Sequence, residues 1–296
     1  MDYKKVEFEE NKVIIKEVKN FDIKQIVECG QCFRWEKIND NDYIGVAFNK
    51  VIEVIQEAET VTILNSSKEE FENIWLRYFD LSRDYSKVKE ELSEDVILSK
   101  SIEFGYGIRL LNQDQFEILI SFIISARNSI PSIMKTIKKI SERWGNEIEY
   151  KGNIYYSFPS PDVLKGVTED EIRETGASFR SKYIVDTINR INEKEDIKFD
   201  LSYISQLNDD DCHMALQEYK GVGAKVSDCV MLFSMGKTSA FPVDVWVKRA
   251  MIHFYNAEEG SLSKIRIFSR NKFKTLAGFA QQYLFYYARE NKIKID

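Results

Sequence analysis

A lysine and an aspartate in the second half of the chain have surroundings that suit covalent chemistry. Lys225 follows the sequence GVGA, and Asp244 comes 19 residues later, directly after Phe-Pro-Val. A lysine in the first turn of a helix lies at the positive end of the helix dipole. Both this position and partial burial would disfavour its ammonium form. Because a neutral amine is a nucleophile, Lys225 is a candidate for nucleophilic catalysis.

Asp244 stands where a helix is expected to begin. It precedes the apolar-periodic segment VWVKRAMIHF, so backbone N–H groups at this N-cap would fix its carboxylate as a positioned, ionised acid. Both residues also have simpler interpretations. Most lysines are solvated surface charges, and most N-cap aspartates only cap their helix. The two residue types alone leave both interpretations open.

The segment around Lys225 has the pattern of two helices joined by a tight turn. Residues 209–235 read DDDCHMALQEYKGVGAKVSDCVMLFSM, an amphipathic helix, a Gly-Val-Gly turn and a second helix closed by Gly236. The glycines permit a turn whose successive backbone N–H groups bind a phosphate without side-chain charge. This predicts a helix-hairpin-helix, with a plain interhelical turn as the alternative.

The hydrophobic patterns divide the chain into two parts. Period-two alternation predicts strands at 12–18, 32–38, 43–56 and 60–64, with a polar turn at 39–42. From about residue 68 the spacing becomes helical, as in FENIWLRYF at 71–79, and little strand pattern returns. We expect an α+β fold: an N-terminal antiparallel twisted β-sheet domain with flanking helices at 1–100, then a mainly α-helical domain at 101–296.

Three local signals predict where helices of the second part begin. Asp114 with Glu117 forms a capping box before FEILISFIIS, and Thr168 forms a second box with the glutamate three residues later, in a helix that ends near Gly176. Ser160 followed by a proline is the third signal, a cap with a first-turn proline.

Composition and charge restrict the class of protein. The 296 residues are 44% hydrophobic and 30% charged, which is typical of a soluble globular protein and excludes a disordered or fibrous one. A net charge of −6 argues against binding to nucleic acid by bulk charge. Residues 1–100 have 15 basic and 22 acidic side chains (−7), whereas residues 101–296 have 27 and 26 (+1). An anionic ligand is therefore expected to meet the second part.

The four cysteines are too few for a secreted disulfide framework. Cys29 and Cys32 form a CxxC without a second pair at metal-ligand spacing, so we expect no zinc or iron–sulfur site. The start of the chain lacks the apolar core of a signal peptide, and no apolar run reaches the length needed to span a bilayer. We expect an intracellular protein with reduced thiols and no membrane role. His213 and His253 are isolated and expected to be structural or surface residues.

A basic stretch at 261–274 contains five cationic and no acidic side chains: Lys264, Arg266, Arg270, Lys272 and Lys274. Such a stretch could be a solvated helix face. Given the predicted hairpin, we interpret it as contact with a DNA backbone.

Several segments together resemble one family. LQEYKGVGAKVSDC followed by FPVDVW resembles the signature of the helix-hairpin-helix DNA glycosylases, and a lysine at the GVGxK position marks their lyase-active members. ECGQCFRW at 28–35, YFDLSRDY at 78–85 and GFAQQYLF at 278–285 resemble segments of the eukaryotic type of 8-oxoguanine DNA glycosylase. The resemblance runs from about residue 21 to 288.

The resemblance implies roles for the reactive pair and for the hairpin. Lys225 matches the nucleophile and Asp244 the catalytic acid residue. The phosphate clamp of the family matches the backbone N–H groups of Gly221, Gly223 and Val226, while Trp246 replaces a phosphate-contacting histidine. The resemblance implies no redox or nucleotide cofactor and allows a structural metal ion at the clamp.

The resemblance also implies a pocket for a flipped-out base. The backbone carbonyl of Gly30 would accept the N7–H of 8-oxoguanine, Gln281 would read the Watson–Crick edge, and Phe285 and Cys229 would sandwich the ring. For Phe285 the aromatic-rich context equally suits core packing. Cys229 lies four residues after Lys225, so an ammonium–thiolate pair could form if the site is dry.

The chain departs from the family pattern where the opposite base is read. Asn128 is retained, Arg127 replaces an asparagine that fills the vacated stack, and Ser132 replaces a cytosine-reading arginine. Phe179 stands where a tyrosine wedges beside that base, although Arg180 matches a second cytosine-reading arginine. These changes predict weaker discrimination of the base opposite the lesion.

The resulting hypothesis is a bifunctional 8-oxoguanine DNA glycosylase and abasic-site lyase of base excision repair. We expect it to act on duplex DNA as a monomer, without a membrane, in the cytoplasm of a bacterium. One alternative is a monofunctional glycosylase for alkylated bases that uses only Asp244. Another is a catalytically silent DNA-binding module, because helix-hairpin-helix units also occur as plain backbone binders.

Overall fold

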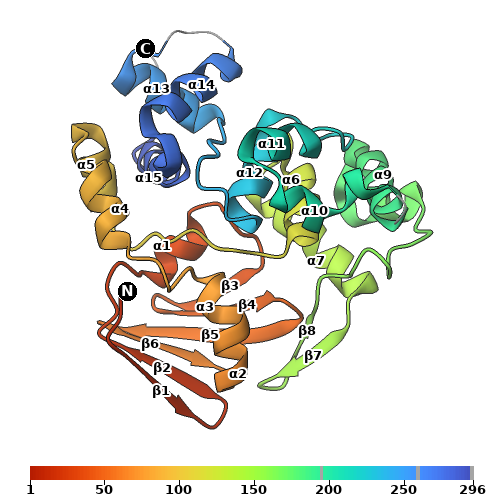
Figure 1. Cartoon of the computed structure of the whole chain (residues 1–296). Helices are drawn as coiled ribbons and strands as arrows, with labels where there is room; N and C mark the ends of the chain where they lie inside the picture. The colour runs from red at the N-terminus through yellow and green to blue at the C-terminus, as the bar shows by residue number, and fades with distance from the viewer. Residues whose placement is uncertain (194–195, 258–260, 294–296) are drawn as a thin grey trace.

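A computed structural model describes residues 1–193, 196–257 and 261–293. An antiparallel sheet of six strands occupies one end of the molecule, and most of the rest is helical (Figure 1). The sheet order is β1-β2-β6-β5-β4-β3. The strands are β1 (Lys5–Glu9), β2 (Lys12–Lys16), β3 (Trp35–Asn39), β4 (Asp42–Ala47), β5 (Lys50–Glu57) and β6 (Thr60–Leu64). The predicted fold class is confirmed.

The sheet differs from the sequence-based expectation in three places. The stretch 43–56 forms two strands, because Phe48 and Asn49 adopt φ values of 50° and 61° and make the tight two-residue turn between β4 and β5. Strand β1 pairs with β2 at the edge of the sheet; its sequence KVEFE alternates, but it is only five residues long and was not predicted. Helix α1 (Ile23–Glu28), capped by Asp22, interrupts the strand region.

The helices between residues 68 and 104 belong to two different cores. A first group, α2 (Lys68–Glu70), the π-helical turn η1 (Phe71–Trp75) and α3 (Leu76–Tyr78), covers the sheet with Trp75 and Tyr78. The next two, α4 (Tyr85–Leu92) and α5 (Val96–Phe104), contribute to the core of the helical part, and α5 packs on α15 (Ala277–Glu290). The expected domain boundary at residue 100 therefore falls inside the helical core.

The helical part contains the segments that position the site. Its further α-helices are α6 (Gln115–Ser125), α7 (Ile130–Trp144), α8 (Glu169–Ile172), α9 (Ser181–Asn192), α10 (Leu201–Gln206), α11 (Asp209–Leu216), α12 (Ala224–Ser234), α13 (Val245–Tyr255) and α14 (Leu262–Phe273). Short turns of other helix types are η2 (Arg173–Ala177), η3 (Ser178–Arg180), η4 (Ile197–Phe199) and η5 (Lys274–Leu276). A small hairpin of β7 (Glu147–Tyr150) and β8 (Asn153–Tyr156), not expected from the sequence, lies beside β5.

The predicted helix starts have mixed outcomes. The Thr168 capping box is confirmed, and the helical segment after it turns at Gly176, where φ is 104°. Asp114 caps α6, but the Glu117 side chain turns toward Arg34 instead of closing the box. The helix predicted at Ser160 is wrong: residues 161–166 form turns, since no apolar-periodic run follows the proline.

A buried arginine joins the N-terminus to both parts of the chain. The Arg109 side chain is fully buried, and its guanidinium donates to the Asp2 carboxylate at 2.8 Å and to the backbone carbonyl of Phe79 at 3.0 Å. The buried Gln31 side chain bridges the same region, donating to the Arg109 carbonyl and accepting from the Leu111 N–H. Residues 28–35 are thereby anchored between the sheet and the helices.

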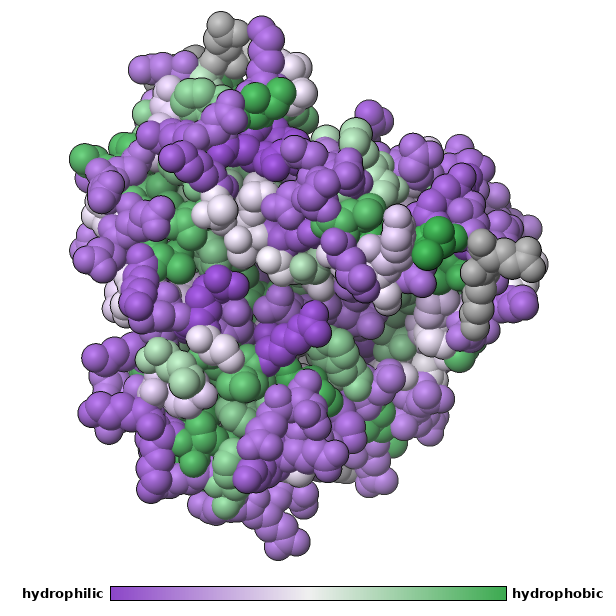
Figure 2. Space-filling model, in the orientation of Figure 1, coloured by the Kyte–Doolittle hydropathy of each residue, from purple (hydrophilic) through white to green (hydrophobic). Residues whose placement is uncertain are grey.

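Most of the face seen in Figure 2 is hydrophilic, with separate hydrophobic patches. In the part of the chain that the structure describes, no helix combines the length and the apolar character needed to cross a bilayer.

Candidate active site

The predicted helix-hairpin-helix is present as α11, a glycine-containing turn and α12. At Gly221 φ is 84°, and a Cβ atom there would lie 2.7 Å from the Tyr183 ring, so only glycine fits. A Cβ at Gly223, the N-cap of α12, would meet nothing within 4 Å, so protein packing does not require this glycine. Val226 is buried in the first turn of α12. The open side of the turn leaves room for a phosphate near the N–H groups of that first turn.

Lys225 is the second residue of α12, as predicted, and it is partly buried. Its Nζ atom lies 4.9 Å from the centroid of the Phe122 ring of α6. Phe122 in turn packs edge-on against Phe33, with 5.5 Å between ring centroids. An aromatic wall thus connects the lysine to the segment 28–35.

Asp244 is the N-cap of α13, as predicted. Its carboxylate accepts a hydrogen bond of 2.8 Å from the Val247 N–H. Burial raises the pKa of Asp244, while that N–H and the charge of Lys225 act in the opposite direction. A raised pKa makes the carboxylate a stronger base than an exposed aspartate. The structure therefore brings the reactive pair together at the starts of two helices.

Cys229 lies one turn after Lys225 on α12 and is buried. Burial raises the pKa of its thiol to about 11, although Lys225 opposes this shift. The thiol form therefore prevails at neutral pH. The ammonium–thiolate pair that the sequence allowed is therefore not favoured, because desolvation of the thiol outweighs the attraction of the neighbouring lysine.

A buried ion cluster beside the reactive pair was not foreseen. Asp228 of α12 is fully buried and accepts two hydrogen bonds from Arg266 of α14, at 2.6 and 2.9 Å. Nδ1 of His213 lies 3.0 Å from the same carboxylate, so the structural role expected for this histidine is confirmed. The signal in the sequence is a lone carboxylate inside the apolar run VSDCVMLF, because a buried charge needs a partner.

Three cationic side chains of the basic stretch at 261–274 pair with carboxylates of the protein: Arg266, Arg270 and Lys272. Arg266 points inward to Asp228, so its predicted contact with DNA is wrong. Arg270 pairs with Asp210 at 2.6 Å and Lys272 with Asp95 at 3.0 Å. Lys264 and Lys274 are exposed, as is His253, which was expected at the surface.

The predicted base pocket joins the loop after α1 to helix α15. At Gly30 φ is 83°, and a Cβ atom there would lie 3.1 Å from the Phe285 ring. A recess of about 450 Å³ opens beside Gly30, with Phe33 and Met134 among its lining residues. Phe285 lies at the edge of the helical core, only partly buried. The structure therefore brings these predicted recognition residues to one place.

Gln281 has an unsatisfied polar atom. The residue is 4% exposed, and within the described parts of the chain its Oε1 atom has no hydrogen-bond partner. A buried acceptor without a partner is costly in a folded protein. A ligand that donates a hydrogen bond would remove this cost, which suits the role predicted for Gln281.

The residues predicted to face the opposite base divide into surface and interior groups. Arg127 is exposed with φ of 52°, and Phe179 is 49% exposed. Asn128 donates to the Ile124 carbonyl at 3.1 Å, and Ser132 is partly buried on α7. These side chains form a candidate wedge surface around the end of α6.

Arg180 points into the protein. It is 5% exposed, and its guanidinium donates to the backbone carbonyls of Ala126 and Arg127, the latter at 3.0 Å. In this conformation it braces the turn beneath Arg127 and is not presented to a base. The structure thus gives Arg180 a supporting role, and its base-reading role stays a prediction.

Trp246 is partly buried in the first turn of α13, with the Arg249 guanidinium 4.9 Å from its ring.

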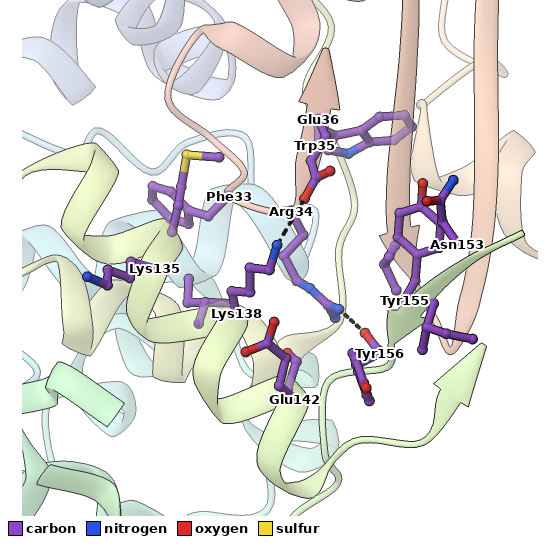
Figure 3. A pocket seen from close by; sticks show the side chains of 15 residues that line it. Phe33, Arg34, Trp35, Glu36, Lys135, Lys138, Glu142, Asn153, Tyr155 and Tyr156 are labelled. Carbon is purple, nitrogen blue, oxygen red and sulfur yellow. Dashed lines mark hydrogen bonds and ion pairs between the residues drawn. The ribbon is translucent and has the colours of Figure 1, made fainter. Parts of the chain in front are cut away.

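A second recess, of about 500 Å³, lies between β3, α7 and β8 (Figure 3). Arg34 crosses this recess to donate to the Tyr156 carbonyl. Its lining includes neither Lys225 nor Asp244, so it supports the segment 28–35 from outside the reactive centre.

Comparison with known proteins agrees with this geometry. Residues 13–119 match the model of the 8-oxoguanine DNA glycosylase N-terminal domain. Residues 120–274 match that of the HhH-GPD superfamily base excision DNA repair proteins.

Relatives span most of the chain. A probable N-glycosylase/DNA lyase of Methanothermobacter thermautotrophicus is 33% identical over 244 residues, which are 76% of this chain and 75% of that protein. The N-glycosylase/DNA lyase of Saccharomyces cerevisiae is 31% identical over 81% of this chain and 70% of its own. The 8-oxoguanine glycosylase/lyase of Clostridium acetobutylicum, solved with double-stranded DNA containing cytosine opposite 8-oxoguanine, is 55% identical, with a TM-score of 0.96 over 99% of this chain and 100% of that one.

Proposed function

This chain belongs to the HhH-GPD superfamily of base excision DNA repair proteins, in the branch with an 8-oxoguanine DNA glycosylase N-terminal domain, and we propose that it excises 8-oxoguanine through Lys225. It is a DNA glycosylase with lyase activity. The observation on which the mechanism rests is that Lys225 and Asp244 begin two helices, close enough for the lysine charge to act on the aspartate carboxyl. Phe122 and Phe33 connect Lys225 to the lining of the Gly30 recess.

The first step is base release. The target nucleotide leaves the stack, and its base enters between Phe285 and the buried Cys229 thiol. The neutral amine of Lys225 attacks C1′ of the deoxyribose, the N-glycosidic bond breaks, and the base leaves with the bonding electrons and takes up a proton. The Asp244 carboxylate stabilises positive charge on the sugar, and its raised pKa favours removal of a proton from the lysine ammonium.

The second step is strand cleavage. The sugar ring opens to give a Schiff base between C1′ and Lys225. Loss of a proton from C2′ then expels the 3′ phosphate by β-elimination, and water releases the lysine. We propose no redox or nucleotide cofactor, because the amine and the carboxylate supply this chemistry. A cation at the hairpin would need backbone carbonyl ligands, since no group of three His, Cys, Asp or Glu side chains gathers for a metal in the described residues.

Duplex DNA is the partner, and the hairpin turn at Gly221 and Gly223 is its proposed phosphate contact. We propose that the protein acts as a monomer in the cytoplasm.

We propose weak discrimination of the base opposite the lesion. Phe179 offers an exposed ring without a hydrogen-bonding group, Ser132 is short, and Arg180 is committed to backbone carbonyls. The single-turnover rates of 8-oxoguanine excision opposite cytosine, adenine, guanine and thymine should differ by less than about a hundredfold. Two good base contacts would give a larger difference. A cytosine preference of a hundredfold or more would contradict this proposal.

Borohydride trapping tests the central role of Lys225. Borohydride reduces a Schiff base to a stable amine, so the native protein should become covalently linked to DNA containing 8-oxoguanine. Lys225→Gln should lose trapping and strand nicking by more than about a hundredfold, since the nucleophile is removed. Lys68→Gln, which changes an exposed lysine of the sheet domain, should trap normally.

The outcomes separate the alternatives. Trapping by Lys225→Gln at the native level would remove Lys225 from its role. Base release without any trapping would favour a monofunctional glycosylase that uses Asp244. DNA binding without base release would favour a silent binding module.

A further inference from the structure

The loop after α1 has its backbone carbonyls held by side chains from helix α15. Arg289 donates from Nη2 to the carbonyl of Glu28 at 2.8 Å. Gln282 donates from Nε2 to the carbonyl of Cys29, also at 2.8 Å. The two side chains are seven residues apart and so lie on one face of α15, two turns from each other. Side chains of one helix therefore hydrogen-bond to the two consecutive peptide groups directly before Gly30.

The next carbonyl after that of Gly30 is also held by a side chain. Gln113 donates to the carbonyl of Gln31 at 2.8 Å. By contrast, no side chain or backbone group of the described residues donates to the carbonyl of Gly30. Within four successive carbonyls, three are fixed by the protein and one remains available as an acceptor.

Such an arrangement suits a contact that must be directional. 8-Oxoguanine has a hydrogen on N7, whereas N7 of guanine is an acceptor. A carbonyl that discriminates between them has to point at N7 before the base arrives, because a mobile carbonyl could turn away from guanine and lose the distinction. Gly30, with φ of 83°, places the carbonyl in a conformation that the neighbouring peptides must maintain.

We propose that Arg289 and Gln282 are positioning residues that aim the Gly30 carbonyl at N7–H of the flipped base. This inference rests on the proposed function and deepens it. Gln282 is 2% exposed, so its amide is not available for other partners. Arg289 is partly buried and links the loop to a second recognition element.

That second element is the stacking ring. Phe285 lies one helical turn before Arg289 on α15. The guanidinium of Arg289 is 5.2 Å from the centroid of the Phe285 ring. Its charge and planar shape favour this packing and restrict rotation of the ring. One side chain thus fixes the peptide preceding Gly30 and the aromatic surface against which the base stacks.

Arg289 also pairs with exposed Glu290, with 2.8 Å between Nε and Oε1. If Arg289 acted only as a surface charge, its effect would depend on this ion pair with Glu290. Glu290→Gln removes that ion pair and leaves the hydrogen bond to Glu28, so it is the matched control.

The experiment measures two activities of the full-length protein. Single-turnover release of 8-oxoguanine from duplex DNA depends on the base pocket. Nicking at a preformed abasic site uses Lys225 without any base. The variants are Arg289→Met, Arg289→Lys, Gln282→Met and Glu290→Gln, with the melting temperature recorded for each.

We expect Arg289→Met to lower 8-oxoguanine release about tenfold, the effect of losing one charged hydrogen bond, and to leave abasic-site nicking within about twofold. Arg289→Lys keeps the charge and one donor and should recover part of the loss. Gln282→Met should repeat the selective loss, and Glu290→Gln should match the native protein in both assays.

Three results would overturn the inference: unchanged release by Arg289→Met, an equal fall in release and nicking, or a Glu290→Gln variant that reproduces the loss. A native protein that nicks abasic sites but releases no 8-oxoguanine would instead reject the proposed function, and with it the role of Arg289. A lower melting temperature with normal release would show that the residue serves only stability.

Discussion

The reactive pair, Lys225 and Asp244, and the base-reading wall, by which we mean Gly30 and the α15 residues that contact its loop, are positioned in different ways. Lys225 and Asp244 stand at the starts of α12 and α13, where the local helix geometry directs each side chain. The wall combines Gly30 with residues of α15, and its hydrogen bonds join residues 253 and 261 positions apart in sequence. The first region depends on local helix starts and the second on contacts between the ends of the chain.

This difference separates chemistry from recognition. Damage to the wall should impair release of an oxidised base while strand nicking at an abasic site continues, because the amine keeps its place. Damage to the reactive pair should abolish both. Each of the following predictions tests this division, in order of decreasing effect.

Asp244→Asn should give the largest effect. Asparagine caps a helix as well as aspartate does, so α13 should remain intact. Loss of the negative charge beside the sugar should lower 8-oxoguanine release by more than about a hundredfold. Single-turnover kinetics would measure this, with Asp200→Asn, at the N-cap of α10, as the control. A tenfold or smaller loss would show that the carboxylate mainly caps.

Gly30→Ala should have a smaller and selective effect. The added Cβ would lie 3.1 Å from the Phe285 ring on a backbone with φ of 83°. Both the displaced carbonyl and the crowded ring should lower 8-oxoguanine release by about tenfold or more, whereas abasic-site nicking should persist.

Gly152→Ala is the matched control for Gly30→Ala. Gly152 has φ of 76° in the β7–β8 turn, and a Cβ there would meet nothing within 4 Å. It imposes a similar backbone strain, about 1 kcal/mol, without entering the pocket. Equal losses of activity in the two variants would contradict the assignment of Gly30 to base reading.

Glu117, which lies against Arg34 of the segment 28–35, should make the stability of the protein depend on pH. Burial raises the pKa of Glu117 from 4.5 to about 7, and Arg34 opposes the shift from 3.5 Å. Between these values the folded state binds more protons than the unfolded state, so this contribution to stability falls as pH rises from about 4.5 to 7.

Glu117→Gln removes that dependence. The free energy of unfolding of the variant relative to the native protein should increase by roughly 1–3 kcal/mol between pH 5 and pH 8. Denaturant unfolding at both pH values would measure the difference. A difference that stays constant with pH would contradict a raised pKa, and one that decreases would indicate that the Arg34 pair dominates.

Side-chain directions that depend on distant partners could not be predicted from the sequence. Arg266 and Arg180 have residue types that suit DNA contact, but Asp228 and the carbonyls after α6 draw them inward. The helix expected at Ser160 also failed, because a cap signal needs a following apolar face to pack. Helix α1 and strand β1 were missed since both are short, and β1 is also largely polar.

The features that depend on neighbouring residues could be predicted from the amino-acid sequence. Caps, glycines and hydrophobic period identified the hairpin, the place of Lys225 and the N-cap of Asp244, because helix starts are set by local hydrogen bonding. By contrast, the contacts of Arg289 and Gln282 with the carbonyls before Gly30, and the burial that keeps the Cys229 thiol neutral, became visible only in the folded protein. Hydrogen-bond partners far apart in the chain and the extent of desolvation arise from packing, which no local pattern encodes.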